Sequence, residues 1–294
     1  MGHRWQAIGK TVCGAAHRRA GLTNQDSITW YPIFEPGPPL VMAVSDGHGS
    51  AKSFRSHWGS AFAVETAREV IREVLKPPPT PISGTDLSNI KRMLEERLPG
   101  ELVRNWEARV SAHFENYPFT HAELEKMTSG DSAGSLESLE KNPLLAYGAT
   151  LITILVTQDY IAYAQLGDGD ILTVSDAGDV SRPLPDDERL FANETTSLCI
   201  KDAWSDFRTG FQVLTNSPPA LMLVSTDGYS NSFLDETDFL KVGSDLLEML
   251  RAEGLQTISA SLYGWLDQAS QEGSGDDITL GVICRMDALQ GGAE

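Results

Sequence analysis

The stretch L-V-M-A-V-S-D-G-H-G-S-A, residues 40–51, decides the fold. Its first five residues are all apolar, which is typical of a strand buried on both faces, and the polar motif S-D-G-H-G ends the strand. The carboxylate of Asp46 and the imidazole of His48 therefore stand two residues apart at a strand end, which suits metal-assisted chemistry. A strand-to-helix turn capped by serine or aspartate would also explain this motif on its own.

The rest of the chain predicts further strands and amphipathic helices around this centre. Apolar residues at three- and four-residue spacing predict helices at 50–76, 86–116, 236–251 and 255–270. Short runs rich in β-branched and aromatic residues predict strands at 5–16, 27–33, 221–225 and 276–285, and an antiparallel meander of three strands from residue 147. Residues 128–142 are predicted to be a surface loop that could end in a helical turn, and residues 181–219 a long irregular excursion.

Composition limits the classes of function. The 294 residues include 23 lysines and arginines against 41 aspartates and glutamates, a net charge of -18, which argues against nucleic acid and anionic lipid as partners. The three cysteines show no C-x-x-C spacing, so neither a disulfide framework nor a zinc site is expected. No apolar stretch approaches the ~20 residues of a membrane span, and no signal-like segment is evident. We therefore expect a cytoplasmic protein in a reducing compartment.

Five aspartates stand at the edges of predicted strands in separate parts of the chain: Asp26, Asp46, Asp168, Asp227 and Asp276. A polar turn would also explain N-Q-D at 24–26, and a hairpin turn would explain G-D-G-D at 167–170. Sheets can bring such strand ends together, and clustered carboxylates without thiolates select a hard ion such as Mg²⁺ or Mn²⁺. Two such ions about 3.5–4 Å apart can activate a water and stabilise a phosphoryl transition state.

Five motifs together resemble those of the type 2C metal-dependent protein serine/threonine phosphatases, most closely the compact bacterial members. They occur in the family's order and spacing over about residues 8–285: N-Q-D (24–26), S-D-G-H-G (45–49), L-G-D-G (166–169), S-T-D-G (225–228) and D-D-I-T (276–279). The resemblance implies an α+β fold, an α-β-β-α sandwich of two central antiparallel sheets covered by helices. It also implies a single domain over 1–294, with a helical segment at about 77–146 and a flap-like segment at about 181–219 inserted.

The resemblance further implies a dinuclear Mg²⁺ or Mn²⁺ centre. Asp46 would bridge the two ions and the carbonyl of Gly47 would join one of them, while Asp227 and Asp276 would hold the other, with Asp26 in or next to the coordination shell. A metal-bridging water would attack phosphoserine or phosphothreonine in line, without a phosphoenzyme. His48 would act as the general acid on the departing alkoxide.

Two positions depart from the family pattern. The arginine that usually holds the phosphate is replaced by Gly21, so His17, Arg18 or Arg19 is expected to take its place. A second acid of the third-metal site is replaced by Asn231, so a third ion at Asp168 and Asn231 is expected to be weak or absent.

The resulting hypothesis is a monomeric Mg/Mn-dependent phosphoprotein phosphatase that acts on phosphorylated proteins. The alternative is a non-catalytic, type 2C-like binding or regulatory module with weakened metal sites, and the intact Asp46, Asp227 and Asp276 favour the enzyme. A metal nuclease would need a basic surface that this acidic chain lacks.

Overall fold

The computed structural model describes residues 2–74, 84–128, 133–185, 196–214 and 218–290, and two antiparallel sheets form its centre. The first sheet has the strand order β1-β10-β9-β6-β7 and the second the order β2-β3-β4-β5-β8. The strands are β1 (Trp5–Val12), β2 (Ser27–Tyr31), β3 (Leu40–Ser45), β4 (Leu151–Val156), β5 (Tyr160–Leu166), β6 (Asp170–Val174), β7 (Val180–Ser181), β8 (Arg208–Val213), β9 (Leu221–Ser225) and β10 (Ile278–Arg285).

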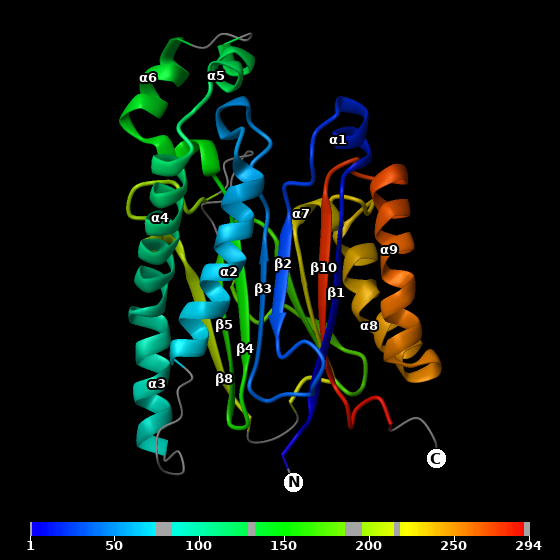
Figure 1. Cartoon of the computed structure of the whole chain (residues 1–294). Coiled ribbons are helices and arrows are strands. Elements are labelled where there is room, and N and C mark those ends of the chain that lie inside the picture. Colours follow the sequence, from blue (N-terminus) through cyan, green and yellow to red (C-terminus); the bar gives the residue numbers. More distant parts are fainter. Residues whose placement is uncertain (1, 75–83, 129–132, 186–195, 215–217, 291–294) are drawn as a thin grey trace.

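Helices cover the outer face of each sheet, as Figure 1 shows. Helices α2 (Ser56–Val74), α3 (Gly84–Glu96) and α4 (Leu98–Asn116) lie on the side of the second sheet, and α8 (Glu236–Glu253) and α9 (Leu255–Glu272) lie on the side of the first. The predicted α-β-β-α sandwich is therefore confirmed. No described helix is long and apolar enough to cross a membrane.

Side chains that point alternately to the two faces of each strand divide the core into three layers. In β3, Leu40, Met42 and Val44 pack between the two sheets. The intervening Val41 and Ala43 pack on the helical side, in a cluster that includes Ala63 of α2. Because successive side chains of a strand point to opposite faces, a strand covered on both faces must be apolar throughout. This explains why the central strand reads as an unbroken apolar run and identifies it as an interior element.

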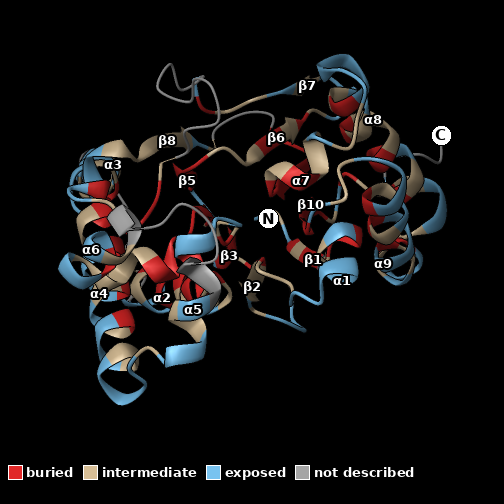
Figure 2. Ribbon diagram, turned by 90° about the horizontal axis from the view of Figure 1, so that it is seen from above, coloured by how far each residue is buried: buried red, intermediate tan, exposed pale blue. Residues whose placement is uncertain are grey.

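Short helices occupy the end of the sandwich at which β3 and β9 finish. Helix α1 (Ala15–Ala20) follows β1, ends at Gly21 in the left-handed conformation with φ of 69°, and lies at the upper end of Figure 1. Helix α7 (Asp227–Ser230) begins directly after β9. In Figure 2, which looks down on this end, buried segments of both sheets converge between the two helical layers.

The sequence interpretation was wrong for two segments. The surface loop predicted at 128–142, for which a helical turn at the end was left open, contains helix α6 (Ala133–Lys141) and follows α5 (His121–Thr128). The loop was predicted because the Gly/Ser-rich composition obscured Leu136 and Leu139, which pack into the core. The excursion predicted at 181–219 contains β8, which pairs with β5 and completes the second sheet. Parts of the predicted segments lie outside the described residues: 75–83, 129–132, 186–195 and 215–217. They fall at the end of the predicted helix 50–76, in the helical segment 77–146 and in the excursion 181–219.

The predicted meander is also interrupted. Strands β4 and β5 pair with each other, but β6 pairs with β9 and β7 in the opposite sheet. The G-D-G segment around Asp168 is therefore a crossover between the sheets and not a hairpin turn. A Cβ at Gly169 would overlap the carbonyl oxygen of Ser225, so this crossover needs glycine where it passes close to β9.

Candidate metal centre

The predicted aspartates lie at one end of the two sheets. Asp46 and Asp168 follow β3 and β5, Asp227 opens α7 directly after β9, and Asp26 and Asp276 precede β2 and β10. Because neighbouring strands are antiparallel, the C-terminal end of one lies beside the N-terminal end of the next. The topology therefore gathers side chains from distant parts of the sequence.

Asp46 lies at the centre of this group. The side chain keeps some contact with solvent, but the surrounding protein removes most of its water, and this burial raises its pKa well above the usual range. The charges of Asp26, Asp227 and Asp276 raise the pKa further, and Asp227 also forms a side-chain hydrogen bond with Asp46. The four carboxyl groups are therefore close enough to repel one another, which is the environment that a bound cation would relieve.

Asp26 is the most enclosed carboxyl of the group, only 6% exposed. One oxygen, Oδ2, accepts a 2.7 Å hydrogen bond from Thr226 Oγ1, whereas Oδ1 is buried without a hydrogen-bond partner among the described residues. Burial raises the pKa of Asp26, the bond from Thr226 and the nearby hydroxyl of Thr279 oppose that shift, and the charges of Asp277 and Asp276 add to it. A buried oxygen without a donor is costly, so Oδ1 is available to a ligand.

Two glycines hold the aspartate loops close together. Around Gly47, a Cβ would approach the carbonyl oxygens of Gln25 and Ser56 to 2.7 and 2.8 Å. A Cβ at Gly228 would overlap the carbonyl oxygen of Asp277 and lie 3.3 Å from the Cβ of Asp276. Glycine is needed at both positions because the backbones approach too closely for a side chain. The second contact brings the start of α7, which carries Asp227, against the start of β10.

His48 lies beside the carboxyl cluster. Burial lowers its pKa, the charge of Asp168 opposes that shift, and the charge of Lys52 adds to it. Its backbone NH donates to the carbonyl of Gly148 at 3.0 Å, and a Cβ at Gly148 would lie 2.6 Å from the imidazole Cδ2. The ring therefore packs against the backbone at Gly148 and lies within electrostatic reach of Asp168.

Asp168 and Asn231 both lie near Asp227. The charge of Asp168 raises the pKa of Asp227, second only to burial. Asn231 Nδ2 donates a 3.0 Å hydrogen bond to Asp227 Oδ2, so its amide group faces the carboxyl cluster. The structure thus brings the residues predicted for a third site to the side of the cluster formed by Asp227.

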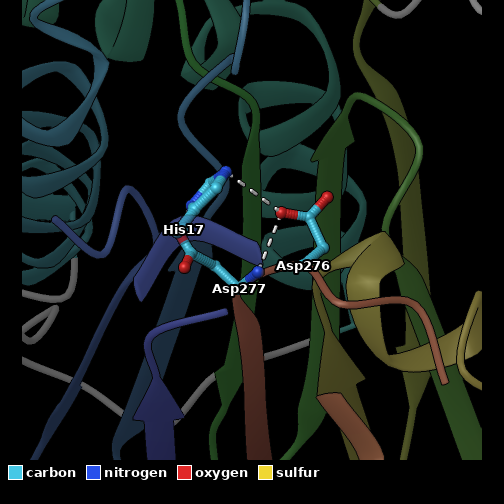
Figure 3. Close-up of side chains that lie close together, drawn as sticks. All are labelled: His17, Asp276 and Asp277. Atoms are coloured by element: carbon cyan, nitrogen blue, oxygen red, sulfur yellow. Dashed lines mark hydrogen bonds and ion pairs between the residues drawn. The ribbon is translucent and has the colours of Figure 1, made fainter. Parts of the chain in front are cut away.

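The basic residues of α1 have different surroundings. Arg18 donates to the carbonyl of Cys13 and forms a 2.8 Å ion pair with Asp267, and Arg19 is exposed. At Gly21, the position that departs from the family pattern, a side chain would meet nothing within 4 Å. His17 instead faces two acids at the start of β10, as Figure 3 shows.

Sequence reasoning missed Asp277, Thr226 and Lys52. Asp277 is only 3% exposed, and its two oxygens accept the backbone NH groups of Gly14 and Gln25, each at 2.6 Å. The pair D-D directly before a strand offered a signal, because successive residues alternate in direction and one of the two acids should turn inward. Lys52 stands four residues after His48, and its charge acts on the imidazole.

The donor set fits divalent cations that prefer oxygen ligands. It combines several carboxyl groups in one cluster with a buried, unpartnered oxygen on Asp26. Carboxylate and carbonyl oxygens are the usual ligands of Mg²⁺ and Mn²⁺. The residues that would hold such ions are Asp26, Asp46, Gly47, Asp227 and Asp276.

Comparisons with known proteins identify the family and the fold. The family model described as Protein phosphatase 2C matches residues 13–267. None of the curated proteins that were searched matches the chain. Among solved structures, the serine/threonine phosphatase Stp1 from Staphylococcus aureus superposes with a TM-score of 0.58 at 14% identity, covering 97% of this chain and 96% of that one.

Two further structures show the same fold. The catalytic domain of the serine threonine protein phosphatase PstP, solved with 2 manganese ions, has a TM-score of 0.55 at 15% identity and covers 96% of this chain and 98% of that one. PppA, described as a regulatory component of the type VI secretion system in Pseudomonas aeruginosa, has a TM-score of 0.56 at 13% identity, with coverage of 96% and 98%. The family match over most of the sequence and the two-sheet sandwich lead to one conclusion: the chain belongs to the protein phosphatase 2C family.

Proposed function

We propose that the protein is a Mg²⁺- or Mn²⁺-dependent protein serine/threonine phosphatase that hydrolyses phosphoserine and phosphothreonine. The observation that carries the proposal is the convergence of Asp46 with Asp26, Asp227 and Asp276 at one end of the sandwich. Membership of the phosphatase 2C family supports the reaction class. The PstP structure with 2 manganese ions supports a dinuclear centre in the same fold.

Each residue of the centre has a distinct proposed role. Asp46, the carbonyl of Gly47, Asp227, Asp276 and Asp26 would hold two divalent ions. When bound, these ions supply an activated water and neutralise charge on the phosphoryl group. The proposed reaction is in-line hydrolysis of the phosphate monoester without a phosphoenzyme. His48 donates its proton to the departing serine or threonine oxygen. This role needs the protonated imidazole, which burial disfavours and the negative charge of Asp168 favours.

Substrate phosphate would be held by cations near the centre. Among the predicted candidates on α1, Arg18 already pairs with Asp267, so its recruitment would require that pair to open, whereas Arg19 is exposed. Lys52 is exposed as well, and its charge reaches His48. We therefore propose Arg19 and Lys52 as the phosphate-binding cations, with Arg18 joining them when its pair with Asp267 opens, and we leave out His17, which faces Asp276 and Asp277.

A third ion, if it binds, would lie at Asp168 and Asn231. Asn231 offers a neutral amide oxygen where a carboxylate would bind more strongly, and its Nδ2 already donates to Asp227. We expect this ion to be the weakest of the three.

Phosphate release from synthetic peptides tests the function directly. Purified protein with Mn²⁺ is expected to dephosphorylate phosphoserine and phosphothreonine peptides, and Asp46→Ala is expected to lose this activity while keeping the wild-type circular dichroism spectrum. A chelator should abolish activity reversibly. Lack of any hydrolysis at saturating Mn²⁺, on peptides and on a chromogenic phosphate monoester alike, would contradict the proposal and indicate a non-catalytic module.

A further inference from the structure

His17, Asp276 and Asp277 form a compact cluster at the edge of the carboxyl centre (Figure 3). Imidazole Nδ1 lies 3.0 Å from Asp277 Oδ2, and Nε2 lies 3.7 Å from Asp276 Oδ1. One candidate ligand atom from each residue lies within 4.8 Å of the others. The question is which of the three side chains can contact an ion.

Asp277 is engaged elsewhere. Both of its oxygens accept backbone NH groups, Oδ1 from Gly14 and Oδ2 from Gln25, each at 2.6 Å. A carboxylate whose lone pairs are used in this way is a poor ligand but a good charge partner for an imidazole. Asp277 Oδ2 lies beside Nδ1 without a hydrogen bond to it, so Nε2 is the ring nitrogen on the side of Asp276.

The imidazole is held in place by the backbone of α1. At the helix start, Ala15 NH donates to Ser270 Oγ at 2.9 Å and Ala16 NH donates to the carbonyl of Gly275 at 2.8 Å. A Cβ at Gly14 would lie 2.6 Å from the backbone nitrogen of Asp277, so this turn abuts the start of β10. The side chain of His17 is only 16% exposed. Its position relative to Asp276 is therefore set by the fold.

The spacing between His17 and Asp276 fits two ligands of one ion. A separation of 3.7 Å between Nε2 and Oδ1 is too long for a hydrogen bond. Two ligand atoms about 2.1 Å from a common ion lie roughly 3–4 Å apart. A buried ligand atom is also present in the same carboxyl cluster: Asp26, 6% exposed, has its Oδ1 unpartnered within the described structure, and burial together with the charges of Asp277 and Asp276 raises its pKa.

We propose that His17 Nε2 is a nitrogen ligand of the divalent ion that Asp276 holds, with Asp277 as the residue that positions the imidazole. This inference rests on the proposed metal centre and adds a ligand to it. Imidazole binds transition metals well, whereas Mg²⁺ prefers an all-oxygen shell. The nitrogen ligand therefore makes this centre selective for Mn²⁺ over Mg²⁺.

Pulsed electron paramagnetic resonance of the Mn²⁺-loaded protein tests the ligand itself. Protein carrying ¹⁵N only in its histidine rings is compared with unlabelled protein, so that any histidine nitrogen bound to Mn²⁺ is identified by the isotope shift. The wild type is expected to show this coupling, His17→Gln to lose it, and the matched control His48→Gln to keep it. Asp277→Asn is expected to keep the coupling while binding Mn²⁺ about tenfold more weakly, as a positioning residue should.

Calorimetric titrations of the same variants give a second readout. The ratio of Mn²⁺ to Mg²⁺ affinity should fall about tenfold in His17→Gln and stay unchanged in His48→Gln. Two bound Mn²⁺ ions without any histidine coupling would overturn the nitrogen ligand and leave the phosphatase proposal intact. A wild-type coupling that survives in His17→Gln would also overturn it, and absence of bound Mn²⁺ would overturn both proposals.

Discussion

At the scale of single residues, Asp46 belongs to the candidate metal centre and destabilises the metal-free protein. Its carboxyl lacks most of its hydration and lies beside Asp26, Asp227 and Asp276, which together raise its pKa. The charged form therefore destabilises the metal-free protein, and a bound cation removes that penalty. Function and metal-free stability are in conflict at this residue.

The first prediction follows from this conflict. In chelator at pH 7, Asp46→Asn should melt about 2–4 °C above wild type, because the amide has no charge to repel its neighbours. Added Mn²⁺ should raise the melting temperature of wild type and leave that of the variant almost unchanged. Thermal unfolding followed by circular dichroism measures both effects, and a variant less stable than wild type in chelator would contradict the account.

His48 gives a prediction that separates a general acid from a structural residue. His48→Asn should lower kcat about 100-fold on a phosphothreonine peptide, whose alkoxide leaves poorly without a proton. On p-nitrophenyl phosphate, whose leaving group departs readily as an anion, kcat should change only a few-fold. Equal losses on both substrates would indicate that His48 does not protonate the leaving group.

Sequence reasoning found the residues of the centre whose position follows from a strand end. Asp46 and Asp227 each follow an apolar strand and precede glycine, so their place at the sheet edge was predictable. Their partners from other strands required strand pairing, which one sequence does not supply. Asp277 was not predicted because only the fold shows which of two consecutive acids turns inward. The separate environments of His17 and Arg18 also could not be predicted, since they depend on the packing of α1 against β10 and α9.

At the scale of elements, Arg55 joins the helical segment to the loop that follows β3. The arginine precedes α2, is 5% exposed, and donates to both oxygens of Glu123 in α5 at 2.7 and 2.9 Å. It also donates to the carbonyl of Tyr117 and to the hydroxyl of Tyr147. One buried guanidinium therefore connects α5, the end of α4 and the turn that precedes β4.

This connection predicts a pH-dependent loss of stability. The hydrogen bonds from Arg55 lower the pKa of Glu123 from 4.5 to about 2. Because the folded-state pKa is depressed, the stabilisation is complete above pH 4.5 and is lost as the pH falls toward 2. Glu123→Gln should lower the free energy of unfolding by about 1–2 kcal/mol at pH 7, and the difference from wild type should shrink below pH 4.5.

Denaturant titrations at pH 7, 4 and 3 check this expectation. Glu137→Gln is the matched control, since Glu137 pairs with Lys141 on the surface of α6 and its side chain is 67% exposed. An exposed pair contributes little, so the control should resemble wild type at each pH. A Glu123→Gln effect independent of pH would contradict the assignment to the ion pair.

Helix α2 packs closely enough on its neighbours to exclude a single methyl group. A Cβ at Gly59 would overlap the carbonyl oxygen of Tyr147, and the Gly59 carbonyl accepts a hydrogen bond from Trp106 Nε1 at 2.9 Å. Gly59→Ala should cost roughly 2–3 kcal/mol of stability despite the better helix propensity of alanine. Gly264→Ala in α9, where a Cβ meets nothing within 4 Å, should stabilise by about 0.5–1 kcal/mol. Denaturant unfolding that ranks the two variants in the opposite order would refute this packing.

Elements were predictable where periodicity was strong. The long amphipathic patterns predicted α8, α9 and the helical stretch that forms α3 and α4 within a few residues, since three- and four-residue spacing reports burial of one helical face. The assignment of β6 to a meander failed because pairing is decided across the sandwich: β9 competes with β5 for this strand and bonds it over Asp170–Val174. The local sequence of β6 does not show which strand it will pair with.

At the scale of the whole molecule, the sandwich explains why so few acids matter in a chain of net charge -18. Most acidic residues lie on the solvated surface, where water screens their repulsion. The two sheets bring together the ends of β3, β5 and β9 and the starts of β2 and β10. Among the residues that the structure describes, carboxyl groups are buried against one another at this junction. We propose that this junction is a dinuclear metal centre.

Calorimetric titration of the metal-free protein with Mn²⁺ measures that claim most directly. The account predicts two ions per wild-type chain, with heat released at both sites, and the loss of at least one site in Asp227→Asn and of both in Asp46→Asn. Binding of no ion, or a stoichiometry that neither substitution changes, would contradict it.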